Sequence, residues 1–128
     1  MIQSRPASLA EVARRAIAGN SFEFELADFL HEFAVRADAA ALTDQPVLLR
    51  DTSPNGAVQD AYLAAVAVNL SARLNHPAPP WTRQPERILP EPWFAAPGRH
   101  MRALLLVESP AAFRERNLFV SANALSVA

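Results

Sequence analysis

Asp28 and His31 have the spacing at which two side chains on one face of a helix can bind a metal ion. A metal site in a helical bundle needs this carboxylate-x-x-His motif twice, together with further carboxylates. The other two histidines, His76 and His100, have no comparable partner in the sequence. The pattern therefore favours a solvated pair at Asp28 and His31, and it predicts neither a metal site nor a cofactor.

The motifs of nucleophilic and nucleotide-dependent enzymes are missing from the sequence. The chain has no Cys, only three Gly, and no Gly-x-Ser-x-Gly turn that could present a nucleophilic serine. It also has no Lys for a Walker A motif and no Gly-x-Gly-x-x-Gly loop to hold a pyrophosphate. We therefore expect a protein that is not an enzyme, with an unrecognised acid–base pair as the alternative.

Charged residues are divided unevenly along the chain. Residues 1–60 hold nine carboxylates and five Arg, whereas residues 61–128 hold four carboxylates and seven Arg. Glu25, Asp28 and Glu32 follow one another at three- and four-residue steps, which predicts an acidic stripe on a helix that a basic partner could contact. The C-terminal arginines, with Arg114 and Arg116 among them, predict a contact with an acidic protein or with nucleic acid, or an ordinary solvated surface.

Four aromatic residues of the C-terminal half are candidates for either a partner interface or the core. Aromatic side chains and Arg are the usual anchors of protein interfaces, and a proline-stiffened segment presents them at a low ordering cost. Packing against the helices is the structural alternative. The four residues are Trp81, Trp93, Phe94 and Phe119.

Three helices are expected to position these side chains. Ser8 and Glu11 form a capping box that begins a helix over residues 8–18, and Gly19 ends it. A second helix begins after Asn20 or Ser21, with Phe29, Leu30 and Phe33 on its buried stripe. A third helix is predicted over residues 57–74, with Asn75 as its C-cap. The Gly19-Asn20 junction suggests a helix-turn-helix, but the acidic second helix would repel phosphate.

The segments around these helices are rich in proline and turn residues. Residues 43–56 read as an exposed loop. Residues 76–97 contain seven of the eleven prolines and read as an ordered arm with one short helical turn near Pro85 to Leu89. After a helix over residues 99–108, we expect Ser109-Pro110 to begin another helix, residues 118–120 to be extended, and Ser121 to cap a final helix.

These patterns predict one all-α domain over residues 1–128, a small helical bundle with an aromatic-bearing arm. It comprises a three-helix core at 8–75, the proline-rich arm at 76–97 and short C-terminal helices at 98–128, and extended structure is expected to be minimal. The composition is that of a globular protein, and no apolar run is long enough to span a bilayer. The lack of Cys fits a reducing bacterial cytoplasm, where we expect the protein to lie.

The sequence resembles a family of small proteins common in high-GC bacterial genomes. The resemblance rests on four segments and covers nearly the whole chain: Ser8 to Val12, Leu26 to Phe33, the Pro80-Trp81-Thr82 and Pro92-Trp93-Phe94 pair, and Ser109 to Leu125. The family is similar to the antitoxin halves of toxin–antitoxin modules, whose toxin would be nucleotidyltransferase-like. The chain departs from the family at Val127, where a basic residue is expected.

The resemblance implies a non-enzymatic antitoxin that neutralises a partner toxin by direct binding, and it supplies no catalytic residue. The partner would contact the acidic stripe or the aromatic arm. A nucleic-acid-associated transcriptional regulator that uses the C-terminal arginines is the competing hypothesis. The residues proposed to bind the partner are Glu25, Asp28, Glu32, Trp81, Trp93, Phe94, Arg114, Arg116 and Phe119.

Overall fold

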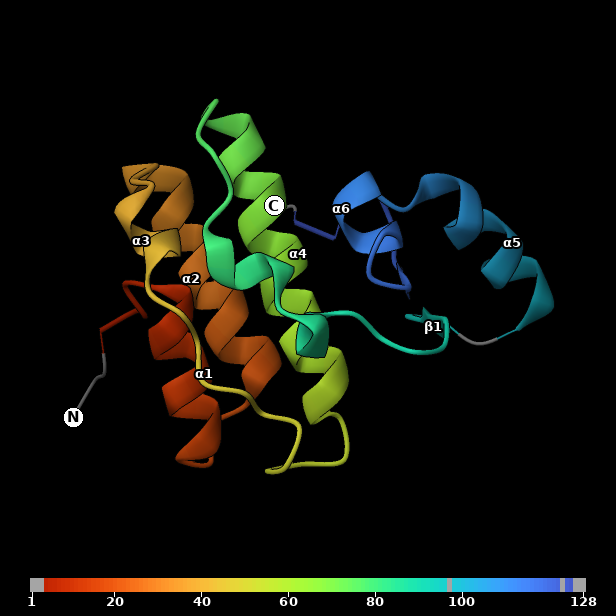
Figure 1. Cartoon of the computed structure of the whole chain (residues 1–128), viewed down its shortest axis with the longest axis horizontal. Helices are drawn as coiled ribbons and strands as arrows, with labels where there is room; N and C mark the ends of the chain where they lie inside the picture. Colours follow the sequence, from red (N-terminus) through yellow and green to blue (C-terminus); the bar gives the residue numbers. More distant parts are fainter. Residues whose placement is uncertain (1–3, 97, 123, 126–128) are drawn as a thin grey trace.

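The computed structural model describes residues 4–96, 98–122, 124 and 125, and these residues are mostly helical (Figure 1). This confirms the predicted helical class and the low strand content. The elements are α1 (Leu9–Ile17), α2 (Phe22–Arg36), α3 (Ala40–Thr43), α4 (Gly56–Arg73), the 3₁₀ helices η1 (Pro80–Arg83) and η2 (Pro85–Arg87), β1 (Trp93–Phe94), α5 (Arg99–Glu108), α6 (Ala111–Arg114) and β2 (Leu118–Phe119).

Side-chain caps begin the first two helices where the sequence predicts them. The Ser8 hydroxyl accepts a hydrogen bond from the Glu11 N–H at 3.1 Å, and the Ser21 hydroxyl accepts one from the Phe24 N–H at 3.2 Å. Each cap satisfies a backbone donor that the helix itself leaves free. Between the two helices Gly19 has a φ of +110°, a conformation that suits glycine.

The helices α1, α2 and α4 share one core, but they do not pack equally on one another. α1 packs on α2, whereas α4 packs mainly on η1, η2, α6 and β2. In Figure 1 the helices α1 to α4 form the main body, and α5, α6 and β1 lie to one side of it. The C-terminal third therefore completes the packing around α4.

The loop before α4 is held against that helix: most of residues 43–56 are exposed as expected, but Pro46 and Leu49 are buried. The Asp60 carboxylate accepts hydrogen bonds from the Leu49 N–H at 2.6 Å and from the Arg50 N–H at 3.1 Å. The buried Arg87 guanidinium lies 3.7 Å from the same carboxylate and donates to the Pro46 carbonyl at 2.6 Å. We call this set, Asp60 and Arg87 with the backbone they bind, the Asp60–Arg87 clasp.

Gly56 begins α4 where the loop crosses it closely. A Cβ added at Gly56 would lie 1.8 Å from the Leu49 carbonyl oxygen and 2.6 Å from the Arg50 Cα, so backbone atoms would have to move. We expect Gly56→Ala to lower the free energy of unfolding by about 1–3 kcal/mol, as overpacking does. The higher helix propensity of Ala alone would raise the free energy of unfolding by about 1 kcal/mol. Urea denaturation measures the free energy of unfolding of both proteins, and the sign of the difference shows which effect is larger.

The proline-rich arm is ordered and folds back over α4. It contains η2 where the one short helical turn was predicted, it contains η1 in addition, and it ends in β1. β1 pairs in parallel with β2, with Trp93 opposite Leu118 and Phe94 opposite Phe119. The sequence predicts extended backbone at Leu118 and Phe119 but not at Trp93 and Phe94.

The C-terminal region agrees with the sequence for α5 and differs after it. Ser109 does not cap α6: its hydroxyl is buried, donates to the Leu105 carbonyl and accepts from the Val120 N–H at 2.8 Å. Residues 121, 122, 124 and 125 are not helical, so the helix predicted after Ser121 is absent from this part of the chain. The remainder of that predicted helix, with Val127, lies outside the described residues.

Candidate functional site

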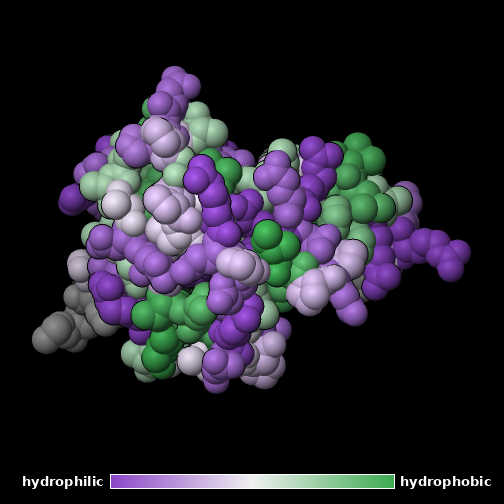
Figure 2. Space-filling model, viewed as in Figure 1, coloured by the Kyte–Doolittle hydropathy of each residue, from purple (hydrophilic) through white to green (hydrophobic). Residues whose placement is uncertain are grey.

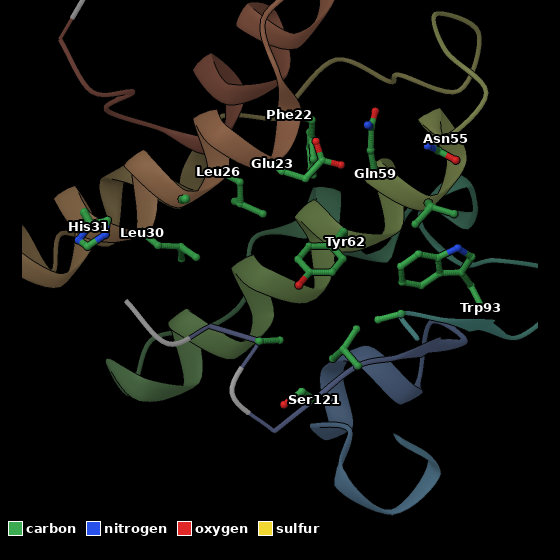
Figure 3. A pocket seen from close by; sticks show the side chains of 15 residues that line it. Phe22, Glu23, Leu26, Leu30, His31, Asn55, Gln59, Tyr62, Trp93 and Ser121 are labelled. Carbon is green, nitrogen blue, oxygen red and sulfur yellow. The ribbon is translucent and has the colours of Figure 1, made fainter. Parts of the chain in front are cut away.

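A groove with a volume of about 560 Å³ runs between α2 and α4 (Figure 3). The end of the arm and the chain after β2 close its other sides. We call this feature the α2–α4 groove. Its lining residues are Phe22, Glu23, Leu26, Ala27, Leu30 and His31 from α2, Asn55, Val58, Gln59 and Tyr62 from the start and middle of α4, Trp93 and Ala95 from the arm, and Val120, Ser121 and Ala124 from the C-terminal segment.

The apolar surface of the groove follows from helical spacing. Phe22, Leu26 and Leu30 recur every four residues and therefore present one face of α2 to the groove. Tyr62 comes from the facing side of α4, and in Figure 3 its ring lies between Leu26 and Trp93. A concave, mainly apolar surface with a few polar groups is typical of a binding site.

One ring contact and one backbone hydrogen bond hold Tyr62 and Trp93 in place on the groove lining. The Tyr62 ring packs edge-on against the buried Phe113 ring of α6, with 5.0 Å between the ring centroids. Trp93 is placed by the sheet, because its backbone N–H donates to the Asn117 carbonyl at 2.8 Å. Burial raises the pKa of the Tyr62 phenol above its usual value, so the phenol stays neutral in the physiological range.

Two ionisable side chains of α2 lie toward opposite ends of the groove. Glu23 and His31 both line it, but they are separated by eight residues of α2, a rise of about 12 Å. General acid–base catalysis needs its groups within hydrogen-bond reach of the same substrate. A rise of about 12 Å along α2 places Glu23 and His31 beyond that reach of each other.

The predicted acidic stripe is not a continuous solvent-exposed surface, so that expectation is corrected. Glu25 is buried and accepts a hydrogen bond at 3.0 Å from Arg15 of α1, because α1 packs on this side of α2. Glu32 is half-buried and pairs with Arg36 on the same helix. Asp28 is half-buried.

Two further residues proposed for partner binding lie in the interior and are corrected as well. Trp81 is buried, and its indole N–H donates to the Leu42 carbonyl at 3.0 Å. Arg116 is buried and donates to the carbonyls of Thr82 and Ala112, each at 2.9 Å. Burial lowers the pKa of Arg116, since desolvation disfavours its charged form. Both side chains join the arm to the rest of the fold.

The remaining predicted residues lie at or near the surface. Arg114 is exposed. Phe94 and Phe119 are half-buried and stack on each other with 5.0 Å between their ring centroids, and the Arg102 guanidinium lies 5.2 Å from the Phe94 ring. Of the nine predicted residues, only Trp93 lines the α2–α4 groove.

A second feature of the surface is the apolar side of α5, which was not predicted. Leu105 is the buried residue of this helix, and it faces the rest of the C-terminal region. Met101, Leu104, Leu106 and Val107 are exposed. The part of the molecule that carries α5 shows apolar side chains at its surface in Figure 2. Apolar side chains gathered on one exposed element often mark an interaction site.

Within residues 4–96, 98–122, 124 and 125, no group of three or more His, Cys, Asp or Glu residues is placed to hold a metal ion. No helix in the same ranges is both long and apolar enough to cross a membrane. Comparison with protein-family models, curated protein sequences and solved structures finds no match to this chain. What the groove binds is therefore inferred from its own residues.

Proposed function

We propose that this chain is a non-enzymatic protein-binding module that receives an apolar segment of a partner protein in the α2–α4 groove. The observation that carries the proposal is the groove itself, an apolar channel of about 560 Å³ between two long helices. Grooves of this kind bind amphipathic segments through apolar side chains spaced along the groove. The one carboxylate on its lining, Glu23, favours a segment with a basic residue.

The sequence resemblance extends this proposal to an antitoxin that neutralises a toxin enzyme by occupying its surface, in the bacterial cytoplasm. The groove supports that proposal through Trp93 of the arm, which lines it, whereas Glu25, Asp28 and Glu32 of the expected acidic stripe do not. Neither competing hypothesis gains comparable support. Arg116 is buried, which divides the arginine cluster that a nucleic-acid contact would use, and Glu23 and His31 are too far apart for acid–base catalysis.

Filling the groove tests the proposal. Ala27 is exposed and lines the groove, so Ala27→Trp would place a large ring in it at little cost to the fold. We expect Ala27→Trp to weaken partner binding by at least roughly tenfold, because the ring and the partner's apolar segment would need the same space. The measurement is calorimetric titration of the purified partner, identified by co-purification from the native host.

Ala34→Trp is the matched control, because Ala34 is also exposed on α2 but does not line the groove. This variant should bind the partner as the wild type does. Equal affinity of the wild type and the Ala27→Trp variant, with both proteins folded by circular dichroism, would show that the partner binds elsewhere.

A further inference from the structure

α5 presents two adjoining apolar rows that nothing in the described chain covers. Met101 and Leu104 lie one turn apart, and Ala103 and Val107 form the neighbouring row. All four are exposed, and Val107 is 80% exposed. The helix packs on β2. No residue of α5 lines the α2–α4 groove, so the groove is not filled by the α5 of its own chain.

We propose that the α2–α4 groove of one copy receives α5 of a second copy, and that the exchange is mutual. Each chain carries the α2–α4 groove and the exposed apolar side of α5, so a reciprocal exchange fills both grooves and covers both helices. The product is a closed dimer with twofold symmetry. This inference needs no foreign protein and therefore goes beyond the proposed function.

The two surfaces match in length. The stretch of α2 that lines the groove, from Phe22 to His31, rises about 14 Å, and the ten residues of α5 span about 15 Å. A helix laid along a groove of this length can place side chains from successive turns in it.

The two surfaces also match in charge. Glu23 is the carboxylate of α2 that lines the groove, whereas α5 carries two Arg and one Glu. Glu23 lines one end of the groove and His31 the other. Arg99 begins the row of Ala103 and Val107 and therefore lies on the same side of α5 as these two residues. With α5 parallel to α2, Arg99 meets Glu23, so opposite charges face each other at this end of the groove.

The first test is the mass of the protein in solution. We expect sedimentation velocity to show a species of twice the 14.0 kDa chain mass at high concentration. Val107→Glu should weaken self-association at least roughly a hundredfold, because a charge would enter both apolar contacts of the dimer. Val35→Glu is the matched control: Val35 is 81% exposed on α2 and does not line the groove, so this variant should remain dimeric.

A charge exchange tests which surfaces meet. Glu23→Arg and Arg99→Glu should each weaken the dimer on the order of tenfold, since each places like charges at both contacts. An equal mixture of the two variants should recover the dimer, because in the mixed pair both contacts again join opposite charges. Both substitutions are at exposed positions, and circular dichroism verifies the fold.

Three results would overturn the inference: a single-chain mass at all concentrations up to about 1 mM, a dimer that Val107→Glu leaves intact, or mixed variants that do not recover. Growth into species larger than a dimer would overturn the reciprocal arrangement. None of these results bears on the proposed function, which fails only if Ala27→Trp leaves partner binding unchanged. Val107→Glu should keep partner binding while losing self-association, so the two proposals fail separately.

Discussion

Replacing Asp60 by Asn is expected to lower the free energy of unfolding by about 3–5 kcal/mol, the range seen when one member of a buried ion pair is removed. The two carboxylate oxygens have different partners: one accepts from the Leu49 N–H and the other from the Arg50 N–H. An amide offers one acceptor oxygen, so its NH₂ group would face one of these backbone donors. Arg87 would also keep its charge without a counter-charge. Urea denaturation measures the loss.

The double replacement Asp60→Leu with Arg87→Met separates charge from backbone contacts. Burial raises the pKa of Asp60, against the hydrogen bonds and arginine charges that lower it, and burial also lowers the pKa of Arg87. Desolvation thus opposes both charges, and removing both costs less than the sum of the single losses. Asp51→Asn, at an exposed position, is the control and should change stability by less than about 0.5 kcal/mol. If the stability lost in the double variant equalled the sum of the losses in the two single variants, the two side chains would not act as a pair.

Replacing Phe29 by Ala is expected to destabilise the protein by about 3–5 kcal/mol, the usual cost of removing a buried phenyl ring. Phe29 is 1% exposed, and its ring lies 5.8 Å from that of Phe33 between α1 and the rest of the core. A loss of this size is a large share of the about 5–15 kcal/mol that stabilises a small domain. Thermal unfolding followed by circular dichroism is the measurement.

Phe24 provides the matched comparison on the same helix. Its side chain is 64% exposed, so Phe24→Ala removes a ring that the fold does not bury and should change stability by less than about 0.5 kcal/mol. A similar loss in both variants would mean that the buried face of α2 has been assigned wrongly.

If the groove serves both a partner and a second copy, the two compete by mass action. Dimer formation would occupy the groove at high protein concentration and leave it free when the protein is dilute. Partner binding would then appear weaker at high concentration of this chain, and Val107→Glu would remove that dependence. Titrations of the partner at several concentrations of this chain measure this dependence.

The sequence by itself determined the helices α1, α2, α4 and α5, because their caps and apolar spacing depend on residues within a few positions of one another. Ser8 and Ser21 cap their helices through hydrogen bonds that span three residues, as expected. Phe29 and Phe33 are buried where the four-residue spacing places them. The short extended pair at Leu118 and Phe119 was also predicted, whereas its partner strand was not.

Only the tertiary structure decided which charged and aromatic residues are accessible. Glu25 is buried with Arg15 of another helix as its hydrogen-bond donor. Arg116 is buried and donates to the carbonyl of Thr82, 34 residues away. The α2–α4 groove likewise joins residues from four separate stretches of the chain. Burial of a polar side chain depends on whether a distant segment supplies its hydrogen-bond partner, and helical periodicity carries no information about which segment that will be.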